Sequence, residues 1–205
     1  MARVGLLGGT FNPPHIGHML CAQEALTELG LDRVLLLPVH TPPHKPMEAD
    51  PGADVRVELC RRAAEGVAGI EVSTLEADRP GRSYTVDTLK ALHEAEPGDQ
   101  LTFILGADQA CGLPDWRDPA GILALAELGV AEREERRRRD VLERLAELPG
   151  AAERVRFFTM PRVDVSSSLI RSRVAAGSPV RWLVPDAVAN AIAERGLYRA
   201  EVAAR

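Results

Sequence analysis

The stretch GGTFNPPHIGH, residues 8–18, lies between a short apolar run at residues 3–7 and an amphipathic stretch at residues 17–29. An apolar run of this length indicates a buried strand, and the longer stretch indicates a helix. Adjacent glycines let the chain turn tightly and bring backbone N–H groups close to an anion, while a helix N-terminus adds unpaired donors and a favourable dipole. The stretch therefore predicts a strand, turn and helix that bind phosphate.

This glycine turn differs from the two commonest nucleotide-binding motifs. Gly5, Gly8 and Gly9 do not have the GxGxxG spacing of dinucleotide-binding turns, and the prolines at 13–14 oppose a direct turn into a helix. The P-loop is also excluded, because no Gly-Lys-Ser or Gly-Lys-Thr sequence follows. We therefore expect another kind of phosphate site.

Two histidines follow the turn. His15 and His18 are three residues apart, so both imidazoles project from one face of the helix start, and Gly17 leaves room for a phosphate. Paired imidazoles can stabilise the charge that develops when a nucleotidyl group moves between phosphate oxygens. Two alternatives stay open: a surface or capping role, or a zinc site shared with His40 and His44, although no carboxylate or cysteine set completes one.

The rest of the chain alternates between short apolar runs and longer amphipathic ones, which predicts an α/β, Rossmann-like, mostly parallel sheet with helices on both faces. The expected strands are 3–7, 33–37, 70–73, 101–105, 128–131 and 155–159. The expected helices are 17–29, 54–65, 84–95, 119–126, 132–148, 168–176 and 185–194. Such sheets bind ligands at the carboxyl ends of their strands.

Composition narrows the class of protein further. At 205 residues and 45% hydrophobic, the chain can form a single domain, 1–205, with a C-terminal helical portion from about residue 166. A formal net charge of -5 favours a small-molecule partner over nucleic acid or a membrane surface. The arginines at 136–139 have acidic neighbours on the same predicted helix, which favours a solvated, salt-bridged face.

The three cysteines form no CxxC pair. No apolar stretch is long enough to span a bilayer, and none resembles a signal peptide. We therefore expect reduced thiols and a cytoplasmic protein.

A second candidate anion site lies near the end of the chain. The segment VSSSLIR, residues 165–171, follows the last expected strand and begins a helix, so serine hydroxyls and helix amides would face an anion that Arg171 can reach. An ordinary serine-capped helix with an exposed arginine is the alternative. The first motif favours phosphate recognition.

GGTFNPPHIGH resembles the signature of the HxGH nucleotidyltransferase superfamily, and VSSSLIR is similar to its ISSTxIR element. The remaining segments resemble one family in it, the nicotinate mononucleotide adenylyltransferases, which make nicotinate adenine dinucleotide and pyrophosphate in NAD biosynthesis. The resemblance implies that His15 and His18 are catalytic and that Mg²⁺ arrives with ATP, with no protein metal site. It also implies a set of ATP-binding residues: Gly8, Gly9, Thr10, Phe11, His15, His18, Gly106, Asp108, Ser167, Ser168 and Arg171.

Three further stretches carry the narrower match: residues 43–45, 81–89 and 106–116. By resemblance, Lys45 contacts the mononucleotide phosphate, Tyr84 and Thr85 bind the pyridine carboxylate, and Trp116 stacks on the pyridine ring. The match is poorest at 130–139, where Arg133 is the candidate for an arginine role.

The motifs leave alternatives for the second substrate and for the activity itself. An acceptor such as nicotinamide mononucleotide, or another phosphate acceptor, requires the same adenylyl chemistry. A non-catalytic ATP-binding sensor is an alternative from another class, and a homo-oligomer is compatible with either.

Overall fold

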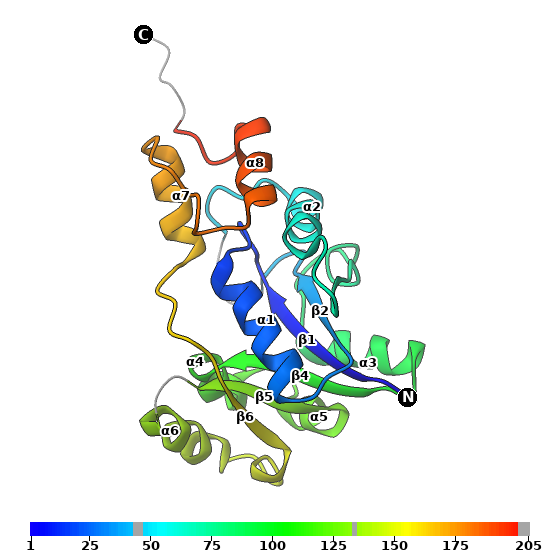
Figure 1. Cartoon of the computed structure of the whole chain (residues 1–205). Coiled ribbons are helices and arrows are strands. Elements are labelled where there is room, and N and C mark those ends of the chain that lie inside the picture. Colours follow the sequence, from blue (N-terminus) through cyan, green and yellow to red (C-terminus); the bar gives the residue numbers. More distant parts are fainter. Residues whose placement is uncertain (43–46, 133–134, 201–205) are drawn as a thin grey trace.

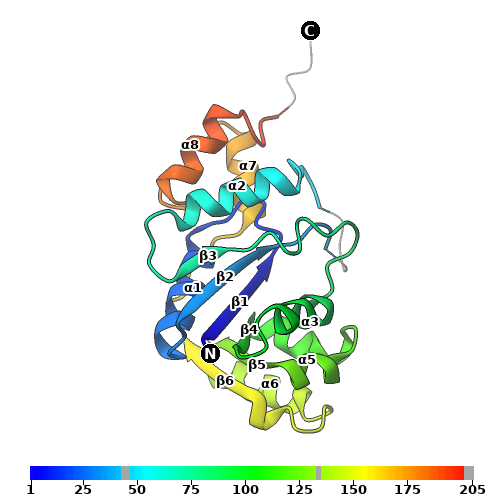
Figure 2. The same ribbon diagram turned by 90° about the vertical axis from the view of Figure 1, so that its right-hand side faces the viewer.

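The computed structural model describes residues 1–42, 47–132 and 135–200. Within these ranges six strands form one parallel sheet in the order β3-β2-β1-β4-β5-β6. Figure 2 shows this order. The strands are β1 (Arg3–Gly9), β2 (Arg33–Pro38), β3 (Ile70–Val72), β4 (Gln100–Gly106), β5 (Ala126–Glu132) and β6 (Val155–Thr159). The strand order is that of a doubly wound sheet, so the expected Rossmann-like class is confirmed.

The strand order places a crevice at the carboxyl ends of β1 and β4. From β1 the chain moves outward through β2 to β3, and it then returns to place β4 against the other side of β1. The connections after β1 and β4 therefore leave toward opposite faces, which is the point where ligands bind in such sheets. Gly9 of β1 and Gly106 of β4 both lie at this edge.

Helices cover both faces of the sheet, because successive strand residues point to opposite sides. Leu36 and Ile104 pack in a cluster with α1 (Ile16–Glu28) and α2 (Ala53–Ala64), whereas Leu37 and Phe103 pack in a cluster on the other face. That second cluster contains residues from α3 (Thr85–Ala95), α4 (Ala107–Gly112), α5 (Pro119–Leu125) and α6 (Glu135–Leu145). Figure 2 shows α1 on one side of the sheet and α3 and α5 on the other.

The last two helices pack on α2 rather than on the sheet. Ile170 of α7 (Ser167–Ala175) and Ile192 of α8 (Asp186–Glu194) share an apolar cluster with Leu59 of α2. Figure 1 shows α7, α8 and α2 grouped at one end of the molecule. This packing brings the serine-rich segment close to the turn after β1.

Most expected elements are confirmed, with differences at their ends. The expected helix 132–148 is wrong at its start, because β5 continues through Glu132 in register with β6, and the helix begins at Glu135. Ala126 belongs to β5 and not to the preceding helix. The short helix α4 was not expected, since its six residues are too few for a periodic pattern. No helix in the described ranges is long and apolar enough to cross a membrane.

Candidate active site

The glycine turn begins where β1 ends. Phe11 has a positive φ of 48° and a fully buried side chain, and it folds back under Gly9, where an added Cβ would lie 3.2 Å from the Phe11 ring. The peptide bond between Asn12 and Pro13 is cis. Glycine at position 9 therefore admits the Phe11 ring, which leaves only the main chain of Phe11 available to a ligand.

The two histidines of this segment lie in contact. His15 is the N-cap of α1, and its ring stacks on that of His18 with 3.7 Å between the centroids. The His15 backbone N–H donates to His18 Nδ1 at 3.2 Å, so the neutral His18 ring carries its proton on Nε2. An added Cβ at Gly17 would lie 3.1 Å from the His15 ring, so this glycine makes room for an imidazole, beyond the phosphate role expected of it.

Burial controls the charge of both rings. It lowers the pKa of His15 to about 4 and lowers the pKa of His18 well below its usual range, with the nearby His15 adding a smaller effect in the same direction. His15 Nδ1 is buried and has no hydrogen-bond partner among the described residues. At neutral pH the pair is therefore uncharged, and an entering phosphate would favour its protonation.

A cavity of about 800 Å³ opens at the carboxyl ends of β1 and β4. Its wall includes most of the expected site residues that the structure describes: Gly8, Gly9, Thr10, Gly17, His18, Tyr84, Thr85, Gly106, Asp108 and Trp116. His15 lies behind this wall, stacked on His18. The glycine turn, residues 8–10, and the acceptor candidates that the structure describes, Tyr84, Thr85 and Trp116, thus line one space. We call residues 8–10 the phosphate turn, after their proposed ligand.

The expected acceptor residues occupy the wall formed by α3 and the short helix after α4. Tyr84 is the N-cap of α3 and Thr85 is its first residue, so free helix amides lie there. Trp116 ends the 3₁₀ helix Leu113–Asp115, and its ring meets Phe103 edge-on with 6.0 Å between the centroids. The Arg117 guanidinium lies 4.6 Å from the centre of the Tyr84 ring.

Asp108 lies in the first turn of α4, after β4. Its carboxylate is exposed and accepts a hydrogen bond of 2.7 Å from Arg137. The arginine run at 136–139 is thus only in part a solvated helix face: Arg138 and Arg139 pair with Glu132 and Glu143, but Arg137 lines the cavity.

The serine-rich segment reaches the glycine turn from the other side, outside the cavity wall. Ser166 caps α7 by accepting from the Leu169 N–H, whereas Ser167 Oγ donates to the carbonyl of Pro13 at 2.8 Å. The Arg171 guanidinium donates to the Asn12 carbonyl at 3.0 Å and to Ser168 Oγ at 3.3 Å. The segment expected to hold phosphates is therefore tied to the turn that begins α1.

Some candidates fall outside the described residues, namely Pro43, His44, Lys45 and Arg133. The zinc alternative, which needs His44, and the roles of Lys45 and Arg133 therefore stay predictions.

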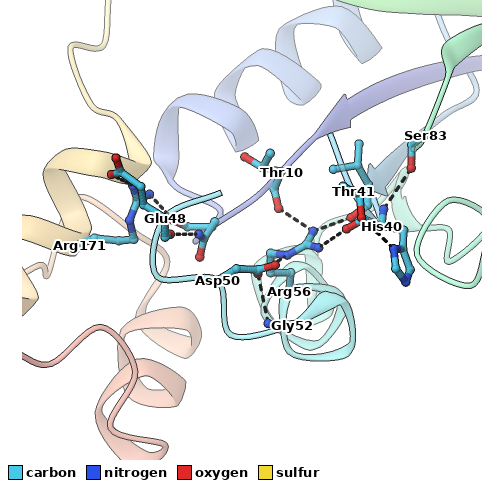
Figure 3. A network of polar contacts seen from close by, with 11 residues as sticks. Thr10, His40, Thr41, Glu48, Asp50, Gly52, Arg56, Ser83 and Arg171 are labelled. Atoms are coloured by element: carbon cyan, nitrogen blue, oxygen red, sulfur yellow. Dashed lines mark hydrogen bonds and ion pairs between the residues drawn. The ribbon is translucent and has the colours of Figure 1, made fainter. Parts of the chain in front are cut away.

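Sequence reasoning missed two buried polar residues beside the site. Glu76 lines the cavity, its carboxylate accepts from Thr88 Oγ1 at 2.7 Å, and burial raises its pKa. Arg56 of α2 is fully buried and donates to main-chain carbonyls of the loops after β1 and β2, as Figure 3 shows. No sequence signal marks either one, because charged residues are usually at the surface and no local pattern identifies the exceptions.

Comparisons with known proteins bear on this geometry. A model of the family described as cytidylyltransferase-like matches residues 6–173. A probable nicotinate-nucleotide adenylyltransferase from Trichlorobacter lovleyi is 41% identical, over 96% of this chain and 99% of its own length. One from Roseiflexus is 42% identical, over 97% and 98% of the two chains.

A solved structure of Plasmodium falciparum nicotinic acid mononucleotide adenylyltransferase, complexed with NaAD, superimposes with a TM-score of 0.75. It covers 97% of this chain and 98% of that one at 15% identity, which supports the fold.

Proposed function

Because the chain belongs to the cytidylyltransferase-like family, and within it to the nicotinate-nucleotide adenylyltransferases, we propose that it joins ATP and nicotinate mononucleotide. The products are nicotinate adenine dinucleotide and pyrophosphate, a step in making NAD. An oxygen of the mononucleotide phosphate attacks the α-phosphorus of ATP, and the bond from that phosphorus to the pyrophosphate oxygen breaks.

One observation carries the assignment of residues: His18, the glycine turn and the acceptor wall of Tyr84, Thr85 and Trp116 line the same cavity. Transfer between phosphate oxygens needs positioning and charge stabilisation more than a protein nucleophile. A single space that holds both phosphates against an imidazole meets that need.

The residues divide into two groups by the substrate that they would hold. His18 would donate from Nε2 to the phosphoryl group in transit, with His15 supporting it, and the amides after Gly8 and Gly9 would hold the triphosphate. Ser167, Ser168 and Arg171 would bind the leaving pyrophosphate, and Asp108 would accept from a ribose hydroxyl. Lys45, Tyr84, Thr85 and Trp116 would hold the mononucleotide.

Magnesium would reach the site on the triphosphate. The carboxylates on the cavity wall already have protein partners: Asp108 bonds Arg137, Glu76 bonds Thr88, and Asp164 bonds Arg162. These residues fit an ion held largely by phosphate oxygens and water. When bound, the ion offsets phosphate charge; withdrawal by a chelator should abolish turnover, and added Mg²⁺ should restore it.

A cytoplasmic location fits this activity. Among the described residues, Cys60 and Cys111 carry free thiols, which is usual in a reducing compartment.

Pyrophosphate release tests the proposal directly. Purified protein with ATP, Mg²⁺ and nicotinate mononucleotide should release pyrophosphate and form the dinucleotide, and nicotinamide mononucleotide should give a lower kcat/KM. Faster turnover with the amide would reassign the acceptor. No pyrophosphate with any mononucleotide, together with measurable ATP binding, would favour a sensor.

A further inference from the structure

The side chain of Arg56 joins the loops that follow β1 and β2, and each of these loops contributes a residue, Thr10 or Val39, to the cavity wall. Its Nη1 donates to the carbonyl of Thr10 at 3.0 Å and to that of Val39 at 2.7 Å, and its Nη2 donates to that of His40 at 3.0 Å. Its Nε donates to Asp50 Oδ1 at 2.9 Å. Every guanidinium nitrogen thus has a partner, as Figure 3 shows.

The hydrogen bonds of Arg56 lie just beyond the end of the β1–β2 ladder. The β1–β2 ladder ends with Gly9 opposite Pro38, and one further bond runs from the Val39 N–H to the Gly9 carbonyl at 3.0 Å. Beyond this bond the two segments separate. There the planar guanidinium of Arg56 connects them, because it donates hydrogen bonds to carbonyls of both.

Each loop leads to a different half of the proposed site. Thr10 belongs to the phosphate turn and lines the cavity. On the other side, the His40 N–H donates to Ser83 Oγ at 3.1 Å, and the Ser83 N–H donates to the Thr41 carbonyl at 3.0 Å. Ser83 immediately precedes Tyr84 and Thr85, so the second loop is attached to the acceptor wall.

The environment of Arg56 favours one fixed geometry. Its side chain is fully buried, and Asp50, its ion-pair partner, also accepts from the Gly52 N–H at the start of α2. Because the guanidinium is buried away from solvent, each N–H group that lost its protein partner would cost free energy of desolvation. The spacing between the two loops is therefore set by a rigid group and not by solvent.

We propose that Arg56 is a positioning residue, which sets the distance between the phosphate turn and the acceptor wall so that the mononucleotide phosphate lines up with the α-phosphorus of ATP. The proposal rests on the proposed function. Loss of this fork should misplace the two substrates relative to each other while each half-site still binds its own ligand. Misplacement of about 1 Å can lower the rate about a hundredfold.

The experiment compares Arg56→Lys and Arg56→Met with the wild type and with Arg62→Met. Arg62 lies on the same helix, is half-exposed and pairs with Glu58 and Glu194 away from the cavity, so it serves as the matched control. For each folded protein, kcat is measured with ATP and nicotinate mononucleotide, and the Kd of each nucleotide alone is measured by calorimetry. The folded fraction is read from a thermal melt at the assay temperature.

We expect kcat to fall about a hundredfold in Arg56→Met and about tenfold in Arg56→Lys, with each Kd changed less than about threefold. Arg62→Met should keep the wild-type kcat. A kcat within twofold of the wild type in Arg56→Lys, or a loss no larger than the unfolded fraction, would overturn the proposal. If Arg56→Met does not fold, Arg56→Lys alone decides. Absence of turnover in the wild type would instead reject the proposed function.

Discussion

The imidazole rings of His15 and His18 stack at 3.7 Å between centroids, with their planes 29° apart. The Phe11 ring meets His18 edge-on from another side, at 4.9 Å. Because packing holds both imidazoles and burial favours their uncharged forms, the pair is already oriented for the proposed contact of His18 with a phosphate. Its charge state and its orientation both depend on burial.

The proposed role of His18 predicts a large loss of turnover on its removal. His18→Ala should lower kcat by about a hundredfold or more, because charge stabilisation on the transferred phosphoryl group is lost. Steady-state pyrophosphate release measures this effect, and circular dichroism checks the fold. His93→Ala, at an exposed position in α3, is the control and should match the wild type. Near-normal turnover in folded His18→Ala would exclude the role.

Burial of His15 predicts a pH-dependent stability. Its pKa is about 4 in the folded protein and about 6.5 when unfolded, so the unfolded chain binds the proton first as the pH falls. The contribution of neutral His15 to the free energy of unfolding is therefore complete above about pH 6.5. It is lost as the pH falls from about 6.5 to about 4, which lowers the free energy of unfolding by roughly 3 kcal/mol at most.

Urea denaturation across this pH range tests that contribution. The free energy of unfolding of His15→Gln should vary less with pH than that of the wild type, and His93→Gln should follow the wild type. Parallel curves for His15→Gln and the wild type would show that the buried imidazole does not control the acid sensitivity.

If Arg171 contacts the leaving pyrophosphate, its removal should change the KM for ATP and leave that for the mononucleotide nearly unchanged. Its guanidinium lies 3.6 Å from the exposed carboxylate of Glu48, a partner that a phosphate could displace. Arg171→Leu should raise the KM for ATP about tenfold and leave the KM for the mononucleotide nearly unchanged, since a charge-assisted hydrogen bond is lost. Arg173→Leu is the control, because Arg173 lies on the same helix as Arg171 and its guanidinium donates to the Pro179 carbonyl. An equal rise in both KM values would indicate a structural role.

The position of Trp116 allows a direct binding measurement. Trp182 is 75% exposed and is the other tryptophan of the chain, so Trp182→Phe leaves Trp116 as the sole indole fluorophore. Nicotinate mononucleotide should quench that fluorescence by stacking. Trp116→Leu should raise the KM for the mononucleotide about tenfold, as expected for a lost aromatic stack. Unchanged fluorescence at saturating mononucleotide would place the ring outside the acceptor site.

Much of the fold could be predicted because local patterns carry it. The six apolar runs correspond to the six parallel strands of the described sheet. A strand that is buried on both faces needs a nearly continuous apolar sequence, so a local pattern marks it. The errors lie at element ends, as at Glu132, where pairing with β6 extends the strand. Strand pairing is a long-range contact that no local pattern records.

In the candidate site, too, the local features could be predicted and the long-range contacts could not. Motif spacing was enough to place Gly8, Gly9 and His18 together, because they lie within one turn and its helix. The burial of His15 and its stacking on His18 could not be predicted, since they depend on Phe11 and on the chain around Gly17.

Local sequence is enough to specify the first strand, the glycine turn and the helix that carries the histidines, because these depend on neighbours within a few residues. Packing between distant segments is needed to bring Arg171 to Asn12, 159 positions away, and to bury Arg56 between two loops. A buried guanidinium is stable only where distant carbonyls converge on it, and that convergence exists only once the sheet and α2 have packed. The histidine motif thus predicts a phosphate site, while the packed fold sets what lies opposite it.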